Sequence, residues 1–267
     1  MNIIILAAGR GTRLGVHNNN KPKCLFNING LSLIERNLII FKEAGLMPAL
    51  VTGFKKEELS FLNLPMIHNS EFLQTNMLWS LYKASDYMNE DFIVCYSDIL
   101  VNTKLVEKIK VFNNGIGLII DKDWLKYWKM RFDDPLVDAE SLKVSKEGNI
   151  TNIGQKVNKI MEIEGQYIGF FKVCGEQRLL FKKKLIDYCE NKQTKNLAKK
   201  AYLTDFLQYL INKDIKIKEI PTNGDWIEID NPSDVNAAKT SGRLSIIDKD
   251  IQRIMNKNNW TDELFTN

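Results

Sequence analysis

The residues best suited to chemistry lie near the start of the chain, where a short apolar run leads into glycines and basic side chains. The run Leu6-Ala7-Ala8 continues as Gly9-Arg10-Gly11-Thr12-Arg13. Glycines let backbone N–H groups approach an anion that a Cβ would exclude, and an arginine offers a planar set of donors matched to phosphate oxygens. These residues indicate an anion site, and a triphosphate is a suitable anion. The alternative is an ordinary strand-to-helix turn, because short G-x-G stretches also occur without ligands.

Three further residues can complete such a site. Lys23 follows the loop and adds a mobile point charge. Asp98 follows the apolar run 92–96, and Asp230 lies near the end of the chain. Mg²⁺ prefers one or two carboxylates together with phosphate oxygens and waters, and ligands of open parallel sheets lie beyond the carboxyl ends of the strands. Asp98 and Asp230 are therefore candidate Mg²⁺ ligands, although a single aspartate at either place would equally suit a turn or a helix cap.

Residues for a second substrate are less distinct. The segment 123–131 places aromatic and basic side chains close together, among them Trp128 and Arg131. Aromatic faces with carboxylates suit an ammonium group, whereas Arg131 suits a phosphate or phosphonate; packing in the core or in a lid is the alternative for the aromatic residues. If the strand near 226 extends through Asp230, the period of two puts Glu228 on the same face, where it could contact this substrate.

The elements that must position these residues follow an alternating pattern typical of a mostly parallel sheet with helical crossovers. We expect strands at 3–6, 49–52, 66–69, 92–97 and 117–120, and helices over 31–44 and 75–87. Ser32 and Glu35 form a capping-box pattern at the start of the first helix. Thr75 is the expected N-cap of the second.

After residue 138 the pattern changes. Short strands at 141–145 and 150–153 flank the turn 146–149, which we interpret as a meander added to the edge of the sheet. We then expect a strand at 167–173, helices over 176–191 and 203–212, strands at 215–220 and 226–228, and a helix beginning at Pro232. The predicted fold is α/β, with a Rossmann-like, mostly parallel sheet flanked by helices and a small β-rich insert. Residues 1–241 form one domain, in which the insert at roughly 121–170 is a lid near the acceptor, and 242–267 is a helical tail.

Composition excludes several classes of protein. The 37 basic and 33 acidic residues leave a net charge of +4, a surplus too small to indicate nucleic-acid binding. The four cysteines lack zinc-type spacing, and the first apolar run is too short for a secretory peptide. No apolar stretch approaches the roughly 20 residues that cross a bilayer. We therefore expect a cytoplasmic protein with reduced thiols and no membrane partner, either a monomer or a homodimer.

The opening string, followed by Lys21-Pro22-Lys23, resembles the signature of the nucleotidyltransferase family that activates sugar phosphates and related phosphorylated alcohols. The resemblance covers most of the chain, because 96–98 and 226–230 are similar to the regions that supply the metal aspartates in that family. It implies a Mg²⁺-dependent enzyme with catalytic residues Arg13, Lys23, Asp98 and Asp230. The residues assigned to the nucleotide are Leu6, Ala7, Ala8, Gly9, Gly11, Thr12, Arg13, Lys23, Asn76, Ser80 and Ser97.

Two later segments narrow the resemblance. The segment 75–82, with Asn76 and Ser80, is similar to phosphocholine-type cytidylyltransferases, whereas the sugar enzymes usually have a glycine-containing element there; Asn76 could equally be only a helix cap. The segments 138–140 and 165–169 resemble cytidylyltransferases that act on phosphonates and phosphoamino compounds. The nucleotide implied is CTP. The residues assigned to the acceptor are Trp128, Arg131, Glu140, Tyr167 and Glu228.

The resulting hypothesis is direct transfer of CMP from CTP to a small phosphorylated or phosphonate acceptor, with release of pyrophosphate stabilised by Arg13 and Lys23. Phosphocholine, aminoethylphosphonate, phosphoglutamine and glycerol phosphate all remain open as acceptors, and decoration of a surface polysaccharide or capsule is the expected use. One alternative is a sugar-1-phosphate uridylyl- or thymidylyltransferase. An alternative from another class is a nucleotide-binding regulatory domain without activity.

Overall fold

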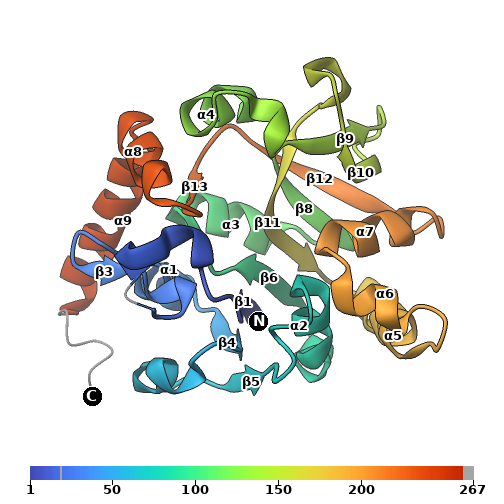
Figure 1. Ribbon diagram of the computed structural model, residues 1–267, viewed down its shortest axis with the longest axis horizontal. Helices are drawn as coiled ribbons and strands as arrows, with labels where there is room; N and C mark the ends of the chain where they lie inside the picture. The colour runs from blue at the N-terminus through green and yellow to red at the C-terminus, as the bar shows by residue number, and fades with distance from the viewer. Residues whose placement is uncertain (19, 261–267) are drawn as a thin grey trace.

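A computed structural model describes residues 1–18 and 20–260 of the chain (Figure 1). Within these residues, seven strands form one sheet in the order β12-β8-β11-β6-β1-β4-β5. All neighbouring pairs are parallel except those of β11, which runs antiparallel to both β6 and β8. The strand bounds are β1 Asn2–Ala7, β4 Met47–Thr52, β5 Met66–His68, β6 Phe92–Tyr96, β8 Ile116–Asp121, β11 Gln166–Val173 and β12 Ile217–Thr222. The predicted fold class is confirmed.

Helices cover both faces of this sheet (Figure 1). Side chains of β1 alternate between the two hydrophobic cores, as the period of two requires: Ile3 and Ile5 face one, and Ile4 and Leu6 face the other. On the first face lie α1 Leu33–Glu43, α3 Thr103–Val111, α4 Trp124–Arg131, α8 Pro232–Thr240 and α9 Arg243–Asn258. On the second lie α2 Met77–Lys83, α5 Gln177–Glu190, α6 Lys195–Lys200 and α7 Leu203–Ile211.

Local capping signals define the helix starts well. Ser32 and Glu35 make the predicted capping box of α1, and Pro232 is the first residue of α8. The prediction for α2 was wrong by one residue, because Asn76 is the N-cap and its side chain accepts the backbone N–H of Met77. The hydroxyl of Thr75 instead donates to the carbonyl oxygen of Glu71 at 2.9 Å.

The meander expected at the edge of the sheet is a separate ribbon. In the described part of the chain, the strands β9 Glu140–Val144 and β10 Ile150–Lys156 form a two-stranded sheet of their own. Single bridges join Leu142 to Ile163, and Asn149 in the turn to Lys218 of β12. Their apolar residues Leu142, Ile150 and Ile153 belong to the core beneath α7, and the turn between the strands contacts the edge strand β12, where the N–H of Glu219 donates to the carbonyl oxygen of Gly148 at 3.1 Å.

Two further short pairs lie outside the main sheet. The ribbon of β2 Asn27–Ile28 and β3 Leu31–Ser32 precedes α1. The strand β7 Ile99–Val101, which the sequence pattern does not reveal, pairs antiparallel with β13 Trp226–Glu228. This pairing sets Glu228 opposite Ile99, and the backbone N–H of Ile229 donates to the carbonyl oxygen of Asp98 at 2.9 Å.

The last helix, α9, packs on the body of the protein through Leu244, Ile247, Ile251 and Ile254, which are part of the core shared with α1. Among the described residues, none of the helices combines the length and the apolar character needed to cross a membrane.

A glycine inside β11 gives a test of this packing. Gly169 has a φ of +79°, and a Cβ built there would lie 2.3 Å from Cδ2 of Tyr96. We expect Gly169→Ala to lower the free energy of unfolding by about 2–4 kcal/mol, since it adds both backbone strain and a steric clash. The measurement is thermal or denaturant unfolding followed by circular dichroism.

Gly148→Ala is the matched control, because Gly148 has a φ of +74° but no atom within 4 Å of the added Cβ. This variant should lose only the backbone part, about 1–2 kcal/mol. Equal losses of unfolding free energy in the two variants would show that a Cβ at residue 169 does not clash with Tyr96.

Candidate active site

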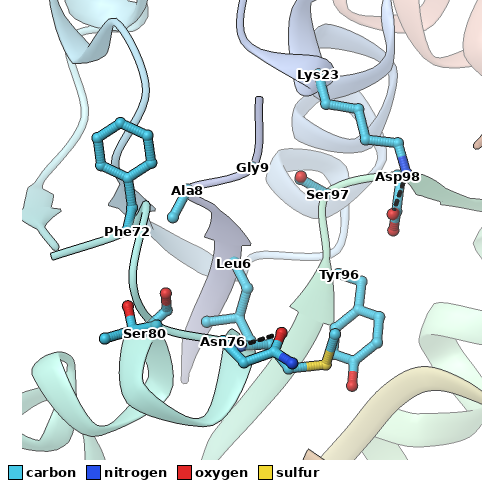
Figure 2. Close-up of a pocket in the computed structure, with 12 residues that line it drawn as sticks. Leu6, Ala8, Gly9, Lys23, Phe72, Asn76, Ser80, Tyr96, Ser97 and Asp98 are labelled. Atoms are coloured by element: carbon cyan, nitrogen blue, oxygen red, sulfur yellow. Dashed lines mark hydrogen bonds and ion pairs between the residues drawn. The ribbon is translucent and has the colours of Figure 1, made fainter. Parts of the chain in front are cut away.

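A cavity of about 190 Å³ opens where β1 and β6 end and α2 begins (Figure 2). Leu6, Ala8 and Gly9 form one wall, and Tyr96, Ser97 and Asp98 form another. The parallel pairing of β1 with β6 brings these two walls together, since it places Leu6 opposite Tyr96. The other residues around the cavity are Lys23, Phe72, Thr75, Asn76, Met77 and Ser80.

Three carboxylates gather at one end of this cavity. Asp98, Glu228 and Asp230 each offer an oxygen, and these oxygens all lie within 4.8 Å of one another. The ammonium group of Lys23 lies among them, 2.5 Å from Oδ2 of Asp98 and in direct contact with Oδ1 of Asp230. Nη2 of Arg13 is 3.1 Å from Oδ2 of Asp230. The pairing of β7 with β13 makes this cluster, because it joins the segment of Asp98 to that of Glu228.

The electrostatics of the cluster follow from this geometry. Burial alone would lower the pKa of Lys23, but Asp98, Asp230 and Glu228 outweigh it and hold the pKa above its ordinary value. Burial opposes ionisation of Asp230, yet Lys23 and Arg13 lower its pKa. The pKa of Glu228 rises to about 7 because of burial and, despite Arg131, the nearby charges of Asp230 and Asp98.

The cluster fits a hard divalent cation. Oδ1 of Asp98 is buried and has no hydrogen-bond partner in the described part of the chain, so an acceptor oxygen is left to coordinate a ligand. Carboxylate oxygens are the ligands that Mg²⁺ takes from proteins. Asp98 and Asp230 were both predicted from the sequence as metal ligands, and the structure brings them together with Glu228, which the sequence analysis had placed only with the acceptor.

A second cavity of about 200 Å³ adjoins the first and shares Met77 and Tyr96 with it. Its walls combine carboxylates with aromatic rings. The residues around it are Trp128, Asp138, Glu140, Gln166, Tyr167, Ile168, Gly169, Tyr202, Thr204, Trp226 and Glu228. Burial, followed by the charges of Asp138 and Asp205, raises the pKa of Glu140 to about 7, although a hydrogen bond with Thr204 opposes the rise. This cavity is suited to a ligand that carries positive charge or several N–H donors.

The structure separates the residues assigned to the nucleotide into two groups. Leu6, Ala8, Gly9, Lys23, Asn76, Ser80 and Ser97 line the first cavity. Ala7 does not, because it is part of the core on the opposite face of the sheet. Gly11, Thr12 and Arg13 lie outside the lining; Arg13 is mostly exposed, and Gly11 leaves room for Lys23, whose Cβ would be 2.9 Å from an added Cβ.

The residues assigned to the acceptor divide in the same way. Trp128, Glu140, Tyr167 and Glu228 line the second cavity, whereas Arg131 lies outside both. The Arg131 side chain is fully buried and donates to Glu228 at 2.6 Å and to Asp234 at 3.0 Å. The expectation that Arg131 contacts an acceptor anion is therefore corrected. Its position is that of a residue that holds Glu228 beside the cluster.

Several lining residues were not found from the sequence. Phe72 and Met77 reach the first cavity only because the segment before α2 folds back onto the sheet. Glu71 anchors that segment: it accepts Nε1 of Trp79 at 2.9 Å and pairs with Lys199 of α6. These contacts are made by single residues far apart in the sequence, so no local sequence pattern predicts them.

The sheet, the loop after β1 and the acid cluster together define an α/β protein with a cavity and a set of carboxylates at the carboxyl ends of its strands, where ligands of open parallel sheets bind. Residues 3–110 match the MobA-like NTP transferase domain family. The CTP:phosphoglutamine cytidylyltransferase of Campylobacter jejuni is 36% identical over 255 residues, which are 88% of this chain and 98% of that protein. The chain therefore belongs to the nucleotidyltransferase family.

Other relatives agree with this assignment. The choline-phosphate cytidylyltransferase of Streptococcus pneumoniae is 31% identical over 155 residues, which cover 56% of this chain and 67% of that protein. The structure of the inositol-1-phosphate CTP transferase from T. maritima superposes with a TM-score of 0.71 at 21% identity, covering 93% of this chain and 96% of that one. The CTP:phosphocholine cytidylyltransferase of S. pneumoniae gives a TM-score of 0.69 at 18% identity and covers 90% of this chain and 98% of that one.

The raised pKa of Glu140 predicts a pH-dependent stability. A carboxyl group with an ordinary pKa of 4.5 and a folded-state pKa of about 7 binds a proton more tightly in the folded state, so its contribution to stability falls as pH rises from 4.5 to 7. Glu140→Gln removes the titrating carboxyl group and with it this pH-dependent loss of stability. The melting temperature of Glu140→Gln minus that of the wild type should therefore increase between pH 5 and pH 8, by up to roughly 8 °C.

The matched control is Glu90→Gln, the same change at an exposed position. Its difference from the wild type should stay constant between the two pH values. A Glu140→Gln difference that also stays constant would contradict the buried, negatively charged surroundings of Glu140.

Proposed function

We propose that the protein transfers CMP from CTP to a small phosphorylated or phosphonate acceptor and releases pyrophosphate. The observation that carries this proposal is the position of the acid cluster at the junction of two adjoining cavities. Asp98 lines the first cavity and Glu228 lines the second, yet both belong to the same set of carboxylates. A nucleotide in one cavity and an acceptor in the other would thus meet at a shared group of ligands.

The reaction requires little covalent chemistry from the protein. An anionic oxygen of the acceptor forms a bond to the α-phosphorus of CTP, and the bond from that phosphorus to the β-phosphate oxygen breaks. The protein has to align the two reactants and to neutralise charge. Mg²⁺ held by Asp98, Asp230 and Glu228 would supply charge neutralisation at the phosphate oxygens. Lys23 and Arg13 lie beside these carboxylates and provide the positive charge for the departing pyrophosphate.

The second cavity supports an acceptor with a cationic nitrogen. Asp138, Glu140 and Glu228 stand among aromatic rings there, and this combination attracts ammonium groups through charge and through cation–π contacts. Phosphoglutamine is our first candidate, because the Campylobacter jejuni relative named for it matches nearly along its whole length. Choline phosphate and aminoethylphosphonate also carry cationic nitrogen and are the acceptors named for other relatives.

The proposal extends to the use of the product. A CMP-linked small group is a suitable donor for decorating a surface polysaccharide or capsule, and a cytoplasmic location would give access to nucleoside triphosphates. These two points rest on the kind of product and follow only if the transfer is demonstrated.

A substrate panel tests the function directly. The protein is incubated with Mg²⁺, one of CTP, UTP or dTTP, and one of phosphoglutamine, choline phosphate, aminoethylphosphonate or glucose 1-phosphate. We expect a CMP adduct and pyrophosphate with CTP and one of the three nitrogen-containing acceptors, detected by mass spectrometry. Turnover only with glucose 1-phosphate would favour a sugar nucleotidyltransferase, and binding without turnover would favour a regulatory nucleotide-binding protein.

The acid cluster gives a specific prediction. Asp98→Asn should lower kcat by about 10²–10³, since it removes one of the charges that position and neutralise the phosphates. Lys23→Ala should have an effect of similar size. Pyrophosphate release measures turnover, and circular dichroism shows whether the fold is retained.

Asp86→Asn is the control for the same chemical change. The Asp86 side chain is 96% exposed, and its Oδ1 lies 4.0 Å from Nζ of Lys182. This variant should retain full activity. Near-normal pyrophosphate release by Asp98→Asn and Lys23→Ala would contradict the catalytic assignment.

A further inference from the structure

A buried amide lies behind the wall of the first cavity. Asn69 follows β5, is 0% exposed and does not line the cavity. Its Nδ2 donates to the hydroxyl oxygens of Thr75 and Ser80, each at 3.0 Å. Its Oδ1 accepts the backbone N–H of Glu71 at 3.1 Å. All the contacts of this side chain are therefore made to the segment and the helix that form the cavity wall.

These contacts fix which way the amide points. A backbone N–H can only donate, so the atom that faces Glu71 must be the oxygen of Asn69. Both N–H bonds of the amide then point at the hydroxyl oxygens of Thr75 and Ser80. The hydroxyl of Thr75 donates a hydrogen bond to the carbonyl oxygen of Glu71 at 2.9 Å, so its hydrogen is already used within the protein.

The hydroxyl of Ser80 differs in this respect. Its oxygen accepts from Asn69, and within residues 1–18 and 20–260 its hydrogen has no recorded acceptor. Ser80 lines the first cavity. A hydroxyl whose oxygen faces a donor must direct its hydrogen elsewhere, and we infer that this hydrogen faces the cavity because Ser80 lines it. Ser80 thus presents a hydrogen-bond donor to whatever binds there.

The neighbouring polar side chain at this end of the cavity, Asn76, is partly engaged. Asn76 uses its oxygen to cap α2 through Met77 at 2.9 Å, and its Nδ2 donates to the carbonyl oxygen of Lys200 at 3.3 Å. Lys23, Ser97 and Asp98 lie at the other end of the cavity, beside the acid cluster (Figure 2). Among the described residues of the α2 wall, Asn76 keeps its second N–H bond and Ser80 its hydroxyl hydrogen, and Ser80 is the one of the two whose polarity a buried amide fixes.

We propose that Asn69 selects cytosine over uracil by fixing the polarity of the Ser80 hydroxyl, which donates to N3 of the base. N3 of cytosine is an acceptor, whereas N3 of uracil carries a hydrogen. A donor facing that hydrogen leaves both groups unsatisfied, and such mismatches discriminate strongly at buried sites. Asn69 touches no substrate and is a positioning residue. This inference rests on the proposed use of CTP.

Asn69→Asp tests the inference by reversing the polarity without a change in shape. A carboxylate still accepts the backbone N–H of Glu71, but it also accepts the hydrogen of Ser80 and so turns the oxygen of Ser80 towards the base. The preference for CTP, measured as the ratio of the Kd for UTP to the Kd for CTP by calorimetry with Mg²⁺, should fall about tenfold. A purely structural role would weaken both nucleotides alike and leave the ratio unchanged.

Two further variants make the result specific to Ser80. Ser80→Ala should lower the same ratio, and Asn69→Asp combined with Ser80→Ala should give the ratio of Ser80→Ala alone, since the amide acts only through the hydroxyl. Asn63→Asp is the control, because it adds the same charge at an exposed position before β5 and should leave the ratio as in the wild type. If Asn69→Asp does not fold, an unchanged ratio in Ser80→Ala still overturns the inference, because the amide acts only through that hydroxyl.

The outcomes separate this inference from the proposed function. A wild type that binds neither CTP nor UTP would overturn the proposed function and the inference together. A wild type that prefers CTP, with the same ratio in Asn69→Asp or in Ser80→Ala, would overturn the inference alone and leave the cytidylyltransferase proposal standing.

Discussion

The antiparallel contact between β7 and β13 is the interaction on which the rest of the site depends. It joins two segments that are far apart in the chain and sets Asp98 beside Glu228 and Asp230. Three carboxylates at this separation repel one another, and burial adds a desolvation cost for each. The buried Lys23 and the exposed Arg13 offset this repulsion, and the buried Arg131 does so from the side of Glu228. Two of these cations come from the segment after β1 and the third from the end of α4, so the cluster is balanced by charges from two separate parts of the fold.

The loop after β1 contributes to this balance of charge, because it carries Arg13 and packs against Lys23. Its glycines serve two different purposes: Gly9 lines the cavity, whereas Gly11 lets the stem of Lys23 pass close to the loop backbone. The strand before the loop decides which residues face the first cavity. Leu6 and Ala8 point to the cavity and Ala7 to the opposite core, since successive side chains of a strand alternate. Anion binding and sheet packing therefore use alternate residues of one short segment.

Local patterns explain how much of the fold the sequence could predict. The mostly parallel strands, the capping box at Ser32 and the position of Asp98 after an apolar run depend on neighbouring residues, and they were predicted. Arg131 could not be assigned from its type, because a guanidinium suits an acceptor phosphate and a buried carboxylate equally well. Only the tertiary pairing with Glu228 and Asp234 separates the two. Asn69 is a similar case, since its partners come from a wall that forms after folding.

Tyr96 stands between the two cavities and limits the space of both. It ends β6, borders both cavities and stands in an edge-to-face arrangement with Tyr167 at 6.3 Å between ring centroids. The positive φ of Gly169 gives the ring its space, because any side chain there would meet it. A ring fixed between β6 and β11 cannot move towards one cavity without enlarging the other. The border between the two cavities is therefore set by an aromatic side chain of the sheet, and the acid cluster at which the proposed nucleotide and acceptor would meet lies just beyond the same strand.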